Sequence, residues 1–172
     1  FRRGLSKMVT TLPRLMLVLT LVVLVVYIAF IPANFMQPFR DRNVLITYNM
    51  MLFAVFGLLV GATPVSADDL SENYQTWLRR GIVAVAALVV LVSVYALAAI
   101  VYRTVQDRLT INRLTIIGWH TINIGLLGLL LYRQGKGGQA KWIESLHSTF
   151  SVASVAYFGW AAFVTLATAW LF

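Results

Sequence analysis

The stretch GIVAVAALVVLVSVYALAAIVY occupies residues 81–102 and contains no charged side chain. An α-helix rises about 1.5 Å per residue, so about 20 residues cross the roughly 30 Å hydrocarbon core of a bilayer. Lipid offers the backbone no hydrogen-bond partners, whereas a helix satisfies its own backbone groups. The stretch therefore predicts one membrane-spanning α-helix.

Four further uncharged stretches flank this one, two on each side. The first is longer than the apolar region of a signal peptide, which has about 7–15 residues, and so predicts a retained helix. Together the five stretches predict an all-α polytopic integral membrane protein with five transmembrane helices in a single domain, residues 1–172. The predicted spans are about 15–36, 44–65, 81–102, 114–132 and 147–172.

The composition excludes most other classes of protein. Of the 172 residues, 60% are apolar and 12% are charged, and the mean hydropathy is +0.81. Soluble domains have about 45–50% apolar and about 25% charged residues. A soluble enzyme, a disordered tail and a nucleic-acid-binding domain are therefore excluded despite the net charge of +8. Without cysteine and with two histidines, the chain predicts no disulfide scaffold and no metal site of its own.

The Lys and Arg side chains lie in the connections between the spans and predict the orientation. Counting alternate connections gives nine basic residues on the side of the N-terminus and five on the other, which favours a cytoplasmic N-terminus. The five on the other side are Arg40, Arg42, Arg103, Arg108 and Arg113.

Small residues in two spans predict close helix packing. Gly57 and Gly61 form a GxxxG pattern, which lets two helices approach closely. In the fourth span, a stripe of small residues occupies an arc of roughly 80° at 100° per residue. His120 and Asn123 lie nearly opposite to it, so we expect this span to be the most enclosed by protein. The stripe consists of Gly118, Thr121, Gly125 and Gly128.

His120 is the one ionisable residue well inside a predicted span, and such residues are functional candidates. The simplest expectation is a buried imidazole bonded to Asn123, a hydroxyl or a backbone carbonyl. As alternatives, it could pass a proton or ligate a haem or a chlorophyll-type pigment. His147 precedes the fifth span and lies poorly for a haem shared with His120. No cofactor is therefore predicted, and haem or pigment binding at His120 stays an alternative.

The sequence favours a structural function. No predicted span contains an internal Asp, Glu, Lys or Arg, although ion-coupled carriers often use such charges. No catalytic set is visible, so we expect a non-catalytic subunit or scaffold of a larger membrane assembly, with lipid and other membrane subunits as partners. The alternative is transport or lipid handling along a neutral polar path near His120 and Asn123, lined also by Thr47, Asn49 and Thr121.

The connection between the third and fourth spans, residues 103–113, contains a helix start. Thr110 can cap the next helix by accepting a hydrogen bond from a backbone N–H two or three residues on. Arg113 then lies in the first turn, where the helix dipole disfavours a cation. We therefore expect an anion beside Arg113: Asp107, a lipid phosphate or a partner's carboxylate. Arg103 and Arg113 are candidate lipid contacts.

The same connection carries a resemblance. Tyr102-Arg103, Leu109-Thr110 and Arg113 resemble the Arg, aromatic-Gly-Leu/Ile-Thr, Arg pattern of a bacterial membrane family catalogued as domain of unknown function 4153. The entry Phe1-Arg2-Arg3, the span ends near Pro32 and Pro64, the Gly57 span and the lead-in Trp77-Leu78-Arg79-Arg80 are also similar. Arg108 departs from the family's glycine.

This resemblance implies a place in a bacterial cytoplasmic membrane, and no established activity. It would cover most of the chain as the family's C-terminal portion. The chain begins at Phe1 and ends at Phe172 without a polar flank, which also favours part of a longer polypeptide.

Overall fold

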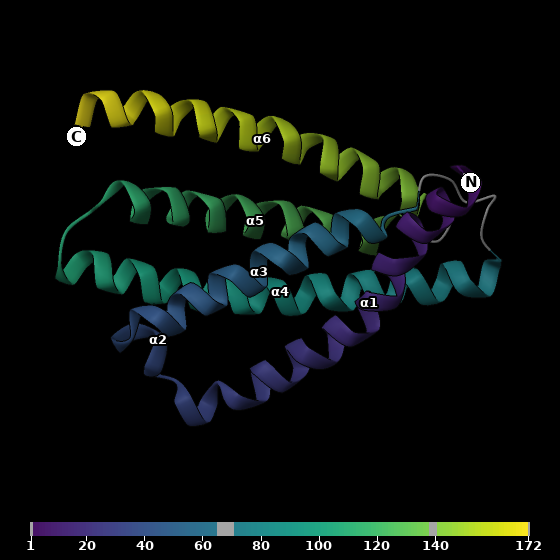
Figure 1. Cartoon of the computed structure of the whole chain (residues 1–172), viewed down its shortest axis with the longest axis horizontal. Coiled ribbons are helices and arrows are strands. Elements are labelled where there is room, and N and C mark those ends of the chain that lie inside the picture. Colours follow the sequence, from purple (N-terminus) through teal and green to yellow (C-terminus); the bar gives the residue numbers. More distant parts are fainter. Residues whose placement is uncertain (1, 65–70, 138–140, 172) are drawn as a thin grey trace.

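The computed structural model of the chain describes residues 2–64, 71–137 and 141–171, and all regular structure in these ranges is helical (Figure 1). This confirms the predicted all-α polytopic class. The helices are α1 (Arg2–Phe30), the short 3-10 helix η1 (Pro32–Asn34), α2 (Gln37–Arg40), α3 (Arg42–Ala62), α4 (Glu72–Gln106), α5 (Ile111–Lys136) and α6 (Trp142–Leu171).

Four of these helices, α3 to α6, are each long and apolar enough to cross a membrane. A fifth crossing results if the bent pair Arg14–Phe30 and Pro32–Arg40 counts as one span. The two parts of this pair meet at 50°. The bend follows from Pro32, which lacks a backbone N–H and cannot continue the α-helix. The predicted first span, 15–36, is thus a helix that ends at Phe30 followed by a turn.

The helix α4 lies at the centre and packs against α1, α3 and α5, whereas α6 packs on α5 at the edge of the bundle (Figure 1). In the most apolar stretch of α4, 44% of the residues are buried, against 33% in the corresponding stretch of α5. The expectation that the fourth span is the most enclosed was therefore wrong. The reason is that α5 packs through the face of His120 and Asn123, and Thr121 and Gly125 of its small-residue stripe face outward.

The connections differ from the predicted ones in length. The helix α4 begins at Glu72, about two turns before the predicted span at 81, because Trp77 to Arg80 continue the helix. The last helix begins at Trp142, five residues before the predicted span at 147. Asp68 and Asp69, in the connection between the second and third predicted spans, and Phe1 lie outside the described residues.

An aromatic cluster holds the bent segment against α4. The Tyr95 hydroxyl donates to the Phe35 carbonyl at 2.7 Å, and its ring contacts Phe35, Phe39 and Tyr48. Tyr102 contacts Phe39 from the next turns of α4. The cluster fixes α2 beside the end of α4 and so determines where α3 begins.

Candidate functional site

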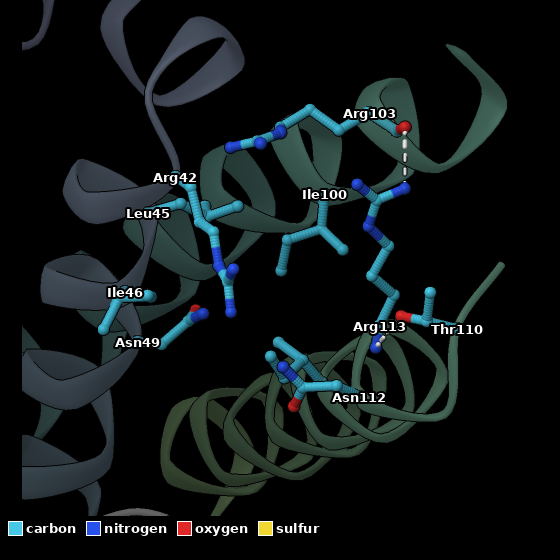
Figure 2. Close-up of a pocket in the computed structure, with 10 residues that line it drawn as sticks. Arg42, Leu45, Ile46, Asn49, Ile100, Arg103, Thr110, Asn112 and Arg113 are labelled. Atoms are coloured by element: carbon cyan, nitrogen blue, oxygen red, sulfur yellow. Dashed lines mark hydrogen bonds between the residues drawn. The ribbon is translucent and has the colours of Figure 1, made fainter. Parts of the chain in front are cut away.

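Three arginines from three helices line one cavity of about 290 Å³ at the end of the bundle where α3 and α5 begin and α4 ends. Arg42 is the first residue of α3, Arg103 lies in the last turn of α4 and Arg113 lies in the first turn of α5. Figure 2 shows them around one space, with Asn49 and Asn112 also facing it. Apolar side chains complete the wall: Leu45, Ile46, Ile100 and Ile116.

Local sequence explains why both helices begin here. The Asp41 carboxylate accepts from the Asn43 backbone N–H at 2.8 Å and caps α3. The Thr110 hydroxyl accepts from the Arg113 backbone N–H at 3.3 Å, which confirms the predicted cap of α5. The N-terminal end of a helix attracts anions because its first backbone N–H groups are unpaired and its dipole is positive there. Two such ends therefore reach this region.

Arg113 is held in a fixed position. Its guanidinium donates to the Asp107 carboxylate at 2.7 Å and to the carbonyl oxygens of Arg103 and Arg108 at 3.1 and 2.9 Å. Asp107 is thus the anion that the position of Arg113 requires. The hydrogen bond from Arg113, aided by its charge, holds the pKa of the Asp107 carboxyl below its usual value.

Arg103 and Arg42 keep bonding capacity for a ligand. The Nη1 of Arg103 is buried and has no hydrogen-bond partner in the described part of the chain. Arg42 is exposed, and Figure 2 shows its guanidinium directed into the cavity toward Asn49. Among the described residues, Arg113–Asp107 is the one salt bridge. The cavity therefore carries a local excess of positive charge.

Below the cavity, polar side chains connect α3, α5 and α6. The Nε2 of fully buried His120 lies 2.8 Å from the Oδ1 of Asn49, which lines the cavity. The Tyr157 hydroxyl of α6 donates to the Oδ1 of Asn123. His120 is therefore paired with Asn49, a residue of the predicted polar path, and not with Asn123. Its Nδ1 is buried without a partner among the described residues.

The predicted packing glycines have different surroundings. A Cβ at Gly118 would overlap the Trp160 ring of α6, so α5 and α6 approach closely there. Gly57 and Gly61 are exposed, and a Cβ at Gly57 would meet nothing within 4 Å. The same open space surrounds Gly125 and Gly128. Within the described residues, Gly118 is thus the member of these patterns that lies at a helix contact, since Thr121 is also exposed.

The two histidines lie apart. The Nε2 of His147 is 2.9 Å from the Pro64 carbonyl oxygen, near the end of α3, whereas His120 bonds to Asn49 near its start. A haem held by both is therefore not compatible with this arrangement. Within the described ranges, no group of three or more His, Cys, Asp or Glu side chains gathers to hold a metal ion.

The sequence indicated Arg103 and Arg113 as candidate lipid contacts but did not connect Arg42 with them, and it did not indicate Tyr157 as the partner of Asn123. The predicted alternation of spans assigns Arg42, Arg103 and Arg113 to the same side of the membrane. Whether the three arginines line one cavity depends on how α3 packs against α4 and α5. The periodicity of apolar residues in the sequence does not predict this packing. Comparison with family models, curated proteins and solved structures found no match.

Proposed function

We propose that the protein is a lipid-handling membrane protein that binds the headgroup of an anionic lipid among Arg42, Arg103 and Arg113. The observation that carries the proposal is the convergence of three guanidinium groups on one small cavity, with one salt bridge among the described residues to offset them. This reading develops the alternative of lipid handling near His120, whose partner Asn49 lines the cavity.

Size and position favour a lipid headgroup. The cavity of about 290 Å³ lies at the low end of small-molecule sites, which measure roughly 300–1,000 Å³, so a phosphate-sized group fits it better than a bulky solute. It lies at the ends of three helices that are each long and apolar enough to span a membrane, and the ends of membrane-spanning helices lie near the lipid headgroups. Arginine suits phosphate because its planar donors can bind two oxygens at once.

The unpartnered Nη1 of Arg103 supports a ligand at this place. A buried donor without an acceptor costs about 1–3 kcal/mol, and more when it is charged. A phosphate oxygen in the cavity would supply the acceptor. Two carbonyl oxygens hold the Nη1 of Arg113 at the cavity, and the Asp107 carboxylate on its Nη2 is the group with which a phosphate would compete.

The test compares binding of phosphatidylglycerol and phosphatidylcholine to the protein in nanodiscs, measured by thermal stabilisation. We expect phosphatidylglycerol to stabilise the wild type and Arg103→Gln to weaken its binding by about tenfold or more, since a charge-assisted hydrogen bond contributes about 1.5–3 kcal/mol. Arg80→Gln is the matched control, because Arg80 is exposed near the opposite end of α4. Equal weakening in both variants, or stabilisation by inorganic phosphate alone, would overturn the proposal.

A second proposal is the role of a non-catalytic subunit of a larger membrane assembly. The observation in its favour is α6, because only 6% of its most apolar stretch is buried within the chain. Large apolar side chains such as Val155, Phe158 and Leu166 are exposed there. We expect a second membrane chain to copurify in mild detergent and to be lost with Phe158→Ala. A monomer free of other chains would contradict this proposal.

A further inference from the structure

A second cavity of about 530 Å³ lies between α3, α5 and α6. Aromatic side chains form most of its wall: Phe53, Phe56, Trp119, Tyr157 and Trp160. Phe56 bridges α3 and α6 by edge contact with Tyr157, at 5.8 Å between ring centroids. We call this cavity the aromatic groove.

The aromatic groove lies beside the arginine cavity on the same two helices. On α3, Asn49 lines the arginine cavity and Phe53, one helical turn further on, lines the groove. On α5, the consecutive residues Thr115 and Ile116 line the groove and the arginine cavity, respectively. The Phe53 ring also contacts the Trp119 ring of α5, at 5.9 Å between centroids. The two cavities are therefore neighbours, although no described residue lines both.

The chemistry of the groove is apolar even where its residues are polar. The Thr115 hydroxyl donates to the Ile111 carbonyl at 2.9 Å, and the Thr165 hydroxyl donates to the Ala161 carbonyl at 2.8 Å. The Tyr157 hydroxyl donates to Asn123. These hydroxyl groups are thus engaged by the protein itself. The Nε1 of Trp160 has no partner among the described residues but is itself buried, so the groove offers mainly hydrocarbon and ring surfaces to its occupant. A polar solute would lose its hydration there without compensation.

We propose that the aromatic groove holds an acyl chain of the anionic lipid whose headgroup binds to the three arginines. This inference rests on the proposed function and specifies its ligand as a whole lipid lying along α3 and α5. A cationic cavity beside an apolar groove matches the arrangement of headgroup and chain in a lipid. Annular lipid alone would occupy the groove without regard to its headgroup.

Brominated acyl chains quench tryptophan fluorescence at short range and so test this placement. The protein is prepared with Trp77→Phe, Trp142→Phe and Trp170→Phe, which leaves Trp119 and Trp160 of the groove as its fluorophores. In phosphatidylcholine nanodiscs, we expect brominated phosphatidylglycerol to quench more than brominated phosphatidylcholine at the same mole fraction. Arg103→Gln should abolish this excess quenching.

Two further variants separate the chain from the headgroup. Ala161→Phe fills the groove, so it should abolish the excess quenching and leave the stabilisation by phosphatidylglycerol in place. A protein whose tryptophan is kept at position 77 alone should show equal quenching by both lipids. If phosphatidylglycerol stabilises the protein through Arg103 but the two lipids quench Trp119 and Trp160 equally, this inference fails and the proposed function stands. If that stabilisation is also missing, both fail.

Discussion

The imidazole Nε2 of His120 lies 2.8 Å from the amide Oδ1 of Asn49 across the interface of α5 and α3. An amide oxygen only accepts, so the imidazole donates from Nε2. This leaves Nδ1 as an acceptor, and it is buried without a partner in the described part of the chain. The bond thus ties α3 to α5 directly below the arginine cavity.

The first prediction concerns the energy of this bond. We expect a double-mutant cycle of Asn49→Ala and His120→Ala to give a coupling energy of about 0.6 kcal/mol and at most about 1.7 kcal/mol, the range found for polar pairs within membranes. Equilibrium unfolding in mixed micelles measures it. Asn123→Ala with His120→Ala is the control pair, because Asn123 bonds to Tyr157 instead, and a larger coupling there would contradict the assignment.

The second prediction uses two glycines of one helix. Gly118→Ala should destabilise the protein, because its Cβ would overlap the Trp160 ring and force α6 away from α5. Gly125→Ala should be neutral or stabilising by up to about 1 kcal/mol, since its Cβ meets nothing within 4 Å and alanine favours a helix more than glycine does. Thermal unfolding in detergent compares the two. The prediction is wrong if Gly125→Ala is the more harmful change.

Gly118 and Gly125 also show which features of the fold can be predicted from the sequence. The spacing of small residues predicted one stripe on α5, but spacing does not say which face of a helix meets a neighbour. The buried face holds His120, Asn123 and Leu127, because burying apolar area and pairing polar groups outweighs close approach alone. The all-α class, the Thr110 cap and Asp107 as one of the expected anions beside Arg113 were predictable because they depend on local sequence. The arginine cavity depends on helix crossing and was not.

The third prediction concerns Asp107, which competes with a ligand for Arg113. Asp107→Asn removes the carboxylate and should tighten binding of phosphatidylglycerol. Asp41→Asn removes the same charge at the same end of the bundle but leaves Arg113 paired, and asparagine still caps a helix. A binding titration of the two variants separates release of Arg113 from general electrostatics. Equal tightening in both would refute the competition.

The pH dependence of this pair has a defined sign. Because Arg113 holds the pKa of Asp107 below its usual value, the pair contributes stability at neutral pH and loses it only as the pH falls through that lowered pKa. Protonation of Asp107 then releases Arg113. We therefore expect wild-type affinity for the lipid to differ from that of Asp107→Asn at neutral pH, and to approach it only at a pH below the ordinary aspartate pKa of about 3.9. A constant difference across this range would contradict the mechanism.

The fourth prediction addresses the bent segment. Tyr95→Phe removes the hydrogen bond to the Phe35 carbonyl, which should cost about 1 kcal/mol and speed amide hydrogen exchange in residues 32–41. Tyr102→Phe is the control, because its ring also contacts Phe39 while its hydroxyl makes no hydrogen bond to the described residues. Exchange followed by mass spectrometry compares the two variants. Equal acceleration would contradict the assignment to the Tyr95–Phe35 hydrogen bond, because both variants keep their rings.

The fifth prediction tests whether α1 and the bent segment cross the membrane together. The chain has no cysteine, so single introduced cysteines report accessibility without background. If the bent pair is one span, Thr11→Cys, Ser71→Cys and Gly137→Cys should react with an impermeant thiol reagent from one side, and Arg108→Cys from the other. Thr11 is exposed and precedes the bent pair, and the other three positions lie at opposite ends of α4 and α5.

The excess of Lys and Arg further predicts that Ser71 and Gly137 lie on the cytoplasmic side with the N-terminus. Reaction of intact cells should therefore label Arg108→Cys, and lysed cells should add the other three. If Thr11→Cys reacts together with Arg108→Cys, the bent segment re-enters on the side on which it begins and the chain has four crossings. If all four assignments are reversed, the crossings stand but the orientation is the opposite one, because the basic bias of nine to five is then outweighed.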